Sequence, residues 1–494
     1  MPSKRTALTV VGVVLAFMVP LLASSREMPI TTSSAEARQI YLQAREKADN
    51  LELQASGELA DQAIAKDPSF AMAYLLRATS GGYQVYRTNM DKAVSLADTV
   101  SPAERHWILA EKAQADGDAA ATRTHLDQLA ALFPDDKHVQ LRLAGYQMMT
   151  VRDDRQAAEH LRRATTIDPE FAAAYNLLGY AQMQTGEFDA AEASFKKYVA
   201  LMPDRPNPYD SYAEMLMKTG RYDESIAQYR KALEKDSTFV SSLAGIGANQ
   251  VFKKDYAAAR ETFEQQGEKS PDLDGKLAAM ENIAKSYVHE GKTVEAARIF
   301  DDMSARAKEG ALPRNAINAR LNAAFVLTEA GKPDEAAHQI ELADTLVQEA
   351  GLPAPQQARL QSAVILARAR GLAAQGQFEA ATREIARTAP AITARQIPGE
   401  VRNLNEVNGY IALRQKHYKE ALAFLQKGDA QSPYATYERA VATEGLGQTK
   451  QAEALFDKVA NWNANDLGYA VVRAEAVQKT DAIAVATKGR KRLP

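Results

Sequence analysis

The side chains that most often carry out chemistry are few in this chain and widely separated. None of its seven histidines lies four residues from another or belongs to a His-Glu-x-x-His pair, so no helical metal site is indicated. The chain has no cysteine, which excludes disulfides, thiolate nucleophiles and cysteine-bound metals. We therefore predict no catalytic residue, no metal and no cofactor.

Glycine-containing stretches give no stronger signal for catalysis. Residues 445–450 lack the Gly-Lys-[Ser/Thr] ending of a phosphate-binding loop, and no strand pattern precedes them. No Gly-x-Ser-x-Gly nucleophile elbow occurs. A turn between two helices is the better explanation of residues 445–450.

The strongest pattern is a strict internal period between residues 138 and 271. Four sets of residues recur every 34 positions without insertion or deletion: Gly145, Gly179, Ala213 and Gly247; Ala157, Ala191, Ser225 and Ala259; Leu161, Phe195, Tyr229 and Phe263; Pro169, Pro203, Ser237 and Pro271. Four in-phase copies indicate an internal structural repeat.

One unit, residues 172–204, predicts two short helices. Tyr175, Leu178 and Gln182 share the face of a first helix, because their spacing of three and four positions follows the helical period. Gly186 suits the left-handed residue that often ends a helix, and Pro203 stops the second one. Arg152 and Lys254 occupy the position of this glycine in two other units.

These residues carry a family resemblance. The pattern Tyr175-x-x-Leu178-Gly179, Ala191-x-x-x-Phe195 and Pro203 resembles the tetratricopeptide repeat, whose usual period is about 34 residues. The resemblance implies an all-α solenoid of helical hairpins that coil into a right-handed superhelix. It also implies protein or peptide partners in a concave groove, and no catalysis.

In this family, ligands usually meet the first helix of each hairpin, so the resemblance also implies partner-binding positions. Tyrosines and methionines at aligned positions would form a semi-apolar stripe suited to an extended peptide or a partner helix. The alternative for the methionines is packing against the following repeat. The predicted positions are Arg142, Tyr146, Met149, Asn176, Tyr180, Met183, Asp210, Glu214 and Met217.

The N-terminus resembles a secretory signal. Lys4 and Arg5 precede a mostly apolar run over residues 7–23, and Ala23 and Ser25 are placed as in a cleavage site. As a helix the run would span roughly 26 Å, a little short of the ~30 Å hydrocarbon core. We predict export to a bacterial periplasm, or retention at the periplasmic face of the inner membrane. A cytosolic chain is the remaining alternative.

Repeats account for nearly all of the chain, in about eleven or twelve units. The predicted segments are a signal or anchor (1–25), a flexible linker (26–35), divergent N-terminal repeats (36–136), four regular repeats (138–271), longer-helix repeats (275–400), two further repeats (402–464), and a capping helix with a basic tail (465–494). No stretch is left that could hold a separate catalytic domain.

Composition narrows the class of partner. Sixty Lys plus Arg against 63 Asp plus Glu give a net charge of −3, which argues against a nucleic-acid-binding surface. We predict a non-enzymatic adaptor for a protein or peptide partner, touching a membrane only through an uncleaved N-terminal segment. The alternatives are a regulatory subunit, a groove-sited enzyme, and self-association through the longer-helix half. The sequence fixes neither the partner nor the oligomeric state.

Overall fold

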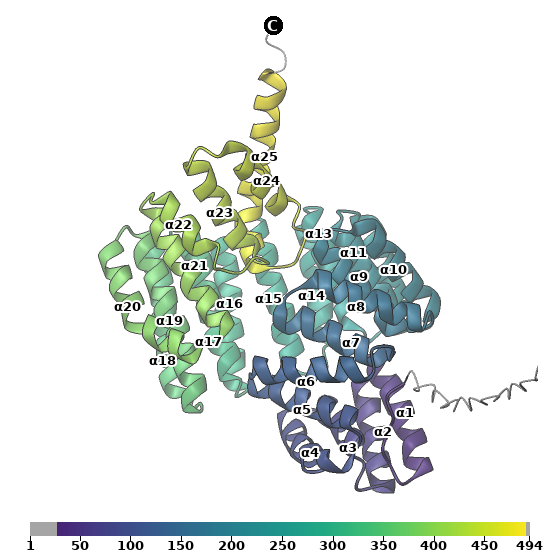
Figure 1. Ribbon diagram of the computed structural model, residues 1–494. Helices are drawn as coiled ribbons and strands as arrows, with labels where there is room; N and C mark the ends of the chain where they lie inside the picture. Colours follow the sequence, from purple (N-terminus) through teal and green to yellow (C-terminus); the bar gives the residue numbers. More distant parts are fainter. Residues whose placement is uncertain (1–26, 491–494) are drawn as a thin grey trace, which may run out of the picture. The chain divides into compact units, whose positions relative to one another are not determined.

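A computed structural model describes residues 27–490, and this part of the chain contains twenty-five α-helices and no strand (Figure 1). The helices follow one another as twelve hairpins, from α1/α2 to α23/α24, and end in α25 (Leu467–Arg490). The predicted all-α repeat fold is confirmed. No helix between residues 27 and 490 is long and apolar enough to cross a membrane. The predicted export signal, residues 1–25, lies outside the described residues.

The chain forms two compact units, the first extending to Ala181 and the second beginning at Gln182. This boundary falls inside the regular repeats, where the period gives no sign of it. The helices of the first unit are α1 (Ala35–Asp49), α2 (Leu53–Lys66), α3 (Ala71–Thr79), α4 (Tyr83–Ser95), α5 (Pro102–Asp116), α6 (Ala119–Leu132), α7 (Lys137–Tyr146) and α8 (Asp154–Ile167), with α9 (Ala172–Thr185) spanning the boundary. The first unit also contains a 3₁₀ turn, η1 (Ala97–Thr99), and a π-helical turn, η2 (Gln147–Val151).

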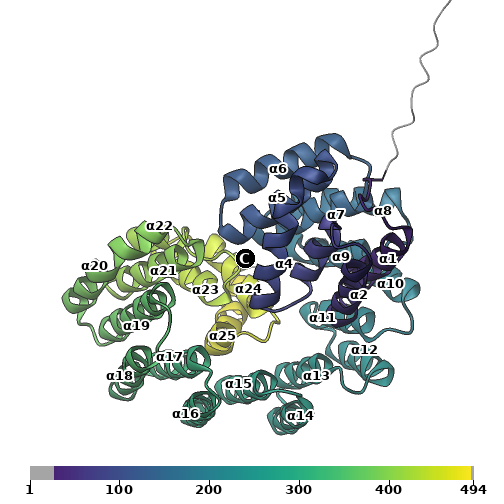
Figure 2. The same cartoon turned by 90° about the horizontal axis from the view of Figure 1, so that it is seen from below.

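The second unit contains the remaining helices. They are α10 (Phe188–Leu201), α11 (Pro206–Lys218), α12 (Tyr222–Lys235), α13 (Val240–Phe252), α14 (Tyr256–Lys269), α15 (Leu273–His289), α16 (Thr293–Glu309), α17 (Pro313–Glu329), α18 (Pro333–Glu349), α19 (Ala354–Ala374), α20 (Phe378–Arg395), α21 (Pro398–Arg414), α22 (Tyr418–Leu425), α23 (Pro433–Gly445), α24 (Thr449–Ala460) and α25. Figure 2 shows α13, α15 and α17 as an inner row, α14, α16 and α18 as an outer row, and α25 on the inner side.

A left-handed residue ends the turn within each regular hairpin. Gly186 has φ 81°, and Arg152 and Lys254, which replace the glycine in their own repeats, both have φ 66°. A left-handed conformation costs a non-glycine residue roughly 1–2 kcal/mol. The hairpin geometry therefore imposes this conformation even where the side chain resists it.

The N-terminal segment before α1 is bound to the repeats of the first unit. The Thr31 amide and hydroxyl donate to the two carboxylate oxygens of Glu104, at 2.7 and 2.5 Å. The Met28 amide donates to Asp136 Oδ2 at 2.7 Å, and the Thr32 hydroxyl donates to Asp67 Oδ2 at 2.6 Å. Composition predicted a flexible spacer here, but polar side chains and backbone amides instead hold residues 28–33 in place.

Burial would raise the pKa of Asp67, but hydrogen bonds from Ser69, Thr32 and Ser33 hold it well below its ordinary value. Asp67, Glu104 and Asp136 are all buried, with exposed fractions of 3%, 0% and 4%. Buried carboxylates are costly unless hydrogen-bonded. The N-terminal segment thus supplies donors that these three side chains require.

The small residues of the period lie where two helices cross closely. A Cβ atom added to Gly247 in α13 would overlap the ring of Phe263 in α14, which is fully buried. A Cβ atom added to the equivalent Gly145 in α7 would meet nothing within 4 Å. Close approach therefore differs between repeats that have the same residue at this position.

We expect Gly247→Ala to lower the free energy of unfolding by roughly 1–3 kcal/mol, because the new methyl group overpacks a buried ring. Gly145→Ala is the matched control, and should be neutral or stabilising by up to about 1 kcal/mol, since alanine favours a helix interior. Urea denaturation followed by circular dichroism measures both. Equal losses in the two variants would contradict the proposed difference in packing.

Candidate binding surfaces

The predicted positions in the first unit do not form one exposed stripe. The Arg142 guanidinium is ion-paired with Glu111 and donates from Nη2 to Gln114 Oε1 at 2.5 Å. Tyr146 is 7% exposed and belongs to the hydrophobic core. Met149 is 72% exposed, because α7 ends at Tyr146 and Met149 lies in the π-helical turn η2. The prediction assumed one continuous α-helix from Arg142 to Met149, but the α-helix ends before Met149.

The two predicted positions in α9 of the first unit also differ from each other. Asn176 is 7% exposed, and its Oδ1 has no hydrogen-bond partner among the described residues. Tyr180 is half-buried. The Asn176 side chain therefore lies in the packed interior, whereas part of the Tyr180 side chain is accessible to solvent.

In the second unit the predicted positions come together. Met183, Asp210, Glu214 and Met217 line one cavity of about 440 Å³. Met183 and Met217 are only 6% and 8% exposed, and Met217 packs in a core cluster with Tyr434 and Tyr469. The methionines are therefore packing residues that also line a cavity.

The opposite wall of this cavity is the protein's own C-terminal segment. Residues 461–466 connect α24 to α25 without helical structure, and Trp462, Asn463 and Asn465 line the cavity. Figure 1 shows this connection as a thin loop that leads from α24 to the start of α25. Residues 461–466 of the chain itself thus line the same cavity as four of the positions predicted for a partner.

Specific polar contacts hold the segment against α11, α12 and α15. The Lys218 ammonium donates to the Trp462 carbonyl at 2.5 Å and lies 4.7 Å from the Trp462 ring centroid. The Tyr222 hydroxyl donates to Asn463 Oδ1 at 2.9 Å, and Asn465 Nδ2 donates to Asn282 Oδ1 at 2.9 Å. Side chains of the repeats thus bind both the backbone and the asparagine side chains of an extended stretch.

Burial shifts the pKa values of two ionisable side chains in this cavity. Burial and the nearby Glu214 raise the pKa of Asp210 to about 6, although Asp210 Oδ1 accepts a hydrogen bond from the Ser242 hydroxyl at 2.6 Å. Burial and Lys458 lower the pKa of Lys218 to about 8. Asp210 can therefore hold or release a proton near neutral pH. No group of three or more metal-binding side chains occurs in the part of the chain that the structure describes.

A second inner-face cluster was missed by the sequence analysis. Tyr180 and Glu214 each precede the left-handed residue of their turn by six positions, and the same count back from Gly331, Gly376 and Lys416 gives Phe325, Arg370 and Tyr410. The Arg370 guanidinium lies 5.6 Å from the Phe325 ring and 4.2 Å from the Tyr410 ring. Counting from the turn, rather than from the 34-residue period, could have located these residues.

Helix α23 covers this second cluster. Arg370 lies 4.9 Å from the ring of Tyr434 and is paired with Glu329 at 3.4 Å. Glu438 is 2% exposed, and burial raises its pKa to about 8 despite Arg370 at 3.8 Å. The inner face of α17, α19 and α21 is therefore closed by a later helix, as the cavity beside α11 is closed by residues 461–466.

Comparison with known proteins identifies the repeat. Two models of the tetratricopeptide repeat match residues 151–215 and 207–238. No curated protein sequence matches this chain.

Solved structures similar to parts of this chain include PilF, PilW and MamA. PilF from Pseudomonas aeruginosa is 19% identical, covering 47% of this chain and 96% of its own, with a TM-score of 0.33. PilW, a type IV pilus biogenesis factor, is 17% identical, covering 47% of this chain and 93% of its own, with a TM-score of 0.30. MamA is 22% identical, covering 33% of this chain and 94% of its own, with a TM-score of 0.30.

We expect Asp210→Asn to remove a pH-dependent loss of stability. The folded-state pKa lies above the ordinary 3.8, so the folded state holds the proton more tightly than the unfolded state. Stability of the native protein should then fall as pH rises from about 4 to about 6, by at most about 3 kcal/mol. Urea denaturation at pH 4, 6 and 8 measures this.

The matched control is Asp189→Asn, at an exposed carboxylate in the first turn of α10. This variant should keep the pH dependence of the native protein. An Asp210→Asn variant with the same pH dependence as the native protein would show that Asp210 is not the group responsible.

Proposed function

Because this protein belongs to the tetratricopeptide-repeat family, we propose that it is a non-enzymatic adaptor that binds an extended peptide of a partner protein along α11, α13 and α15. Binding of protein or peptide partners is the general role of this repeat. The finer part of the proposal is the position of the peptide and its chemistry, and both come from the second unit.

The observation that supports this proposal is the chain's own segment at residues 461–466. It is extended, and side chains of the repeats bind its backbone carbonyl at Trp462 and its amide side chains at Asn463 and Asn465. A separate peptide held by an inner helix face would make contacts of the same kind. Residues 461–466 thus illustrate the contacts that a bound partner peptide would make.

The contacts specify the chemistry of the partner peptide. An aromatic side chain is favoured beside Lys218, through a cation–π contact that contributes about 0.5–2 kcal/mol. An asparagine is favoured next to it, since Tyr222 donates to its Oδ1 and the Lys218 carbonyl accepts from its Nδ2 at 3.3 Å. A partner must also displace residues 461–466, which are tethered and therefore present at a high effective concentration.

We expect a labelled peptide of residues 459–467 to bind the Trp462→Ala, Asn463→Ala double variant at least tenfold more tightly than the native protein, because the internal competitor is weakened. Fluorescence anisotropy measures the affinity, and circular dichroism verifies that the variant keeps its helices. A peptide with Trp462→Ala should bind poorly.

The control variant is Asn461→Ala, whose side chain bonds only within α24, to Asp457, among the described residues. It should bind the peptide as weakly as the native protein. If the folded double variant and this control bind the peptide equally, the groove is not a peptide site of this kind.

One observation favours a second candidate, a groove-sited enzyme or a regulatory subunit. Asp210 and Glu214 lie one helical turn apart in the same cavity, and the pKa of Asp210 is raised by burial first and by Glu214 second. Paired carboxylates of this kind can exchange protons in acid–base catalysis. A turnover that Asp210→Asn abolishes while peptide affinity is retained would favour this candidate over the adaptor.

We also propose that the protein is exported to the cell envelope, on the basis of the basic and apolar N-terminal residues. Fractionation of cells followed by N-terminal sequencing tests this, and we expect a periplasmic protein that begins near Arg26. A full-length cytosolic protein would contradict export, whereas a full-length protein in the membrane fraction would indicate a retained anchor.

A further inference from the structure

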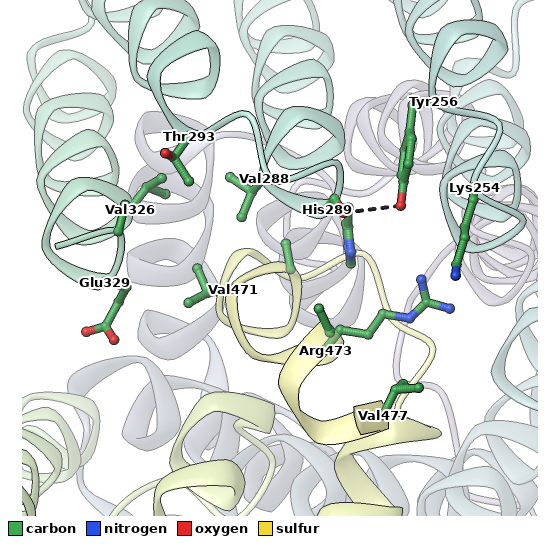
Figure 3. A pocket seen from close by; sticks show the side chains of 14 residues that line it. Lys254, Tyr256, Val288, His289, Thr293, Val326, Glu329, Val471, Arg473 and Val477 are labelled. Carbon is green, nitrogen blue, oxygen red and sulfur yellow. Dashed lines mark hydrogen bonds between the residues drawn. The ribbon is translucent and has the colours of Figure 1, made fainter. Parts of the chain in front are cut away.

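A second cavity of about 520 Å³ lies in the second unit, where α25 packs against the repeats (Figure 3). The repeats contribute the turn residue Lys254, the first residues of α14 and α16, and the C-terminal ends of α15 and α17. Helix α25 contributes Val471, Arg473 and Val477. Cavities of ~300–1,000 Å³ are typical of small-molecule sites. This cavity is separate from the one lined by Asp210 and Glu214.

The cavity has two chemically different sides. Figure 3 shows Lys254, Arg473, His289 and Tyr256 on one side, and Val326 and Val471 toward the other. The apolar side chains form a wall that favours a hydrocarbon group. A ligand with one polar end and a hydrocarbon chain fits these two sides.

The polar side carries positive charge that the described residues do not neutralise. Neither Lys254 nor Arg473 forms an ion pair with a carboxylate in the described part of the chain. The Arg473 guanidinium donates from Nη2 to the Phe252 carbonyl at 3.4 Å, and its Nε is buried without a partner. Two cations beside one cavity attract an anion.

The carboxylate that lines the cavity does not offset these cations. Glu329 lies on the far side in Figure 3, beyond Val471. Its Oε1 is 3.4 Å from Arg370 and its Oε2 is 3.8 Å from Arg414. The charge of Glu329 is therefore already matched by the buried arginine cluster.

At this cavity, His289 places a polar atom that has no hydrogen-bond partner within residues 27–490. Its Nε2 is buried and has no hydrogen-bond partner among the described residues, while its backbone carbonyl accepts from the Tyr256 hydroxyl at 3.1 Å. Burial, Arg473 and Lys285 lower the pKa of His289 to about 3, so the ring is neutral at physiological pH. A buried polar atom without a partner is costly, and a ligand atom could satisfy it.

We propose that this cavity binds a small carboxylic acid with an aliphatic chain, its carboxylate between Lys254 and Arg473 and its chain against Val288, Val326 and Val471. A guanidinium and an ammonium together match a carboxylate, which can accept from both. Each methylene placed on the apolar wall should tighten binding by about threefold to fourfold. Since α25 supplies Arg473 and Val471, the ligand also fastens α25 to the repeats.

Isothermal titration of the full chain with octanoate tests this proposal. We expect octanoate to bind about tenfold more tightly than hexanoate, and octanol, octylammonium and inorganic phosphate to bind much more weakly. A rise in melting temperature with octanoate should accompany binding, since a ligand of the folded state stabilises it.

Lys254→Gln should weaken octanoate binding at least tenfold. The matched control is Lys253→Gln at the neighbouring position, which pairs with Asp223 and does not line the cavity, and this variant should keep the native affinity. Lys254 is exposed at a turn, so its loss leaves the fold intact.

Three results would overturn the proposal: no binding of octanoate, equal binding of octanol, or equal loss of affinity in the two lysine variants. Tight binding of a peptide with a C-terminal leucine, together with weak binding of octanoate, would also overturn it and assign the cavity to a protein terminus.

Discussion

Each helical hairpin of this protein can bury its apolar face only against another part of the chain, and a repeat array leaves its inner face without such a partner. The second unit meets this constraint with its own C-terminal elements. Tyr434 and Glu438 of α23 cover the Arg370 cluster, and Trp462 and the segment that follows it cover α11. Burial on the inner face therefore comes from residues that do not belong to the regular period.

The polar character of this inner face explains why its cover must be specific. Arg370 is buried among aromatic rings, which an arginine tolerates better than a lysine because its guanidinium is less strongly hydrated. Glu438 accompanies it with a raised pKa and so tends to keep its proton near neutral pH. A covering element that lacked Tyr434 would remove one of the aromatic rings that Arg370 contacts.

The repeat architecture could be predicted from sequence because it rests on local spacing. Small residues such as Gly247, the turn residue Gly186 and the breaker Pro203 act within about one hairpin of themselves. The period also located Asp210, Glu214 and Met217, which do share a cavity. Met149 lies outside the aligned surface because a π-helical turn changes the register after Tyr146, and no spacing rule signals that change.

The contacts that hold residues 461–466 against the repeats could not be predicted from local spacing. Lys218 and Trp462 are 244 positions apart, and Trp462 lies in a segment that follows no period. The lysine and tryptophan are ordinary surface residues when each is considered with its sequence neighbours. Only the fold brings them together, and the same holds for Asp136 and Met28.

The contact between Met28 and Asp136 also has a consequence for the order of events during synthesis. The two residues are separated by 108 positions, and a ribosome adds about 5–20 residues per second. About 5–20 s therefore pass between the synthesis of Met28 and the synthesis of Asp136, which accepts its hydrogen bond. During that interval the N-terminal segment stays accessible to any cellular factor that acts on a nascent chain, and docking closes this window once the fourth hairpin begins.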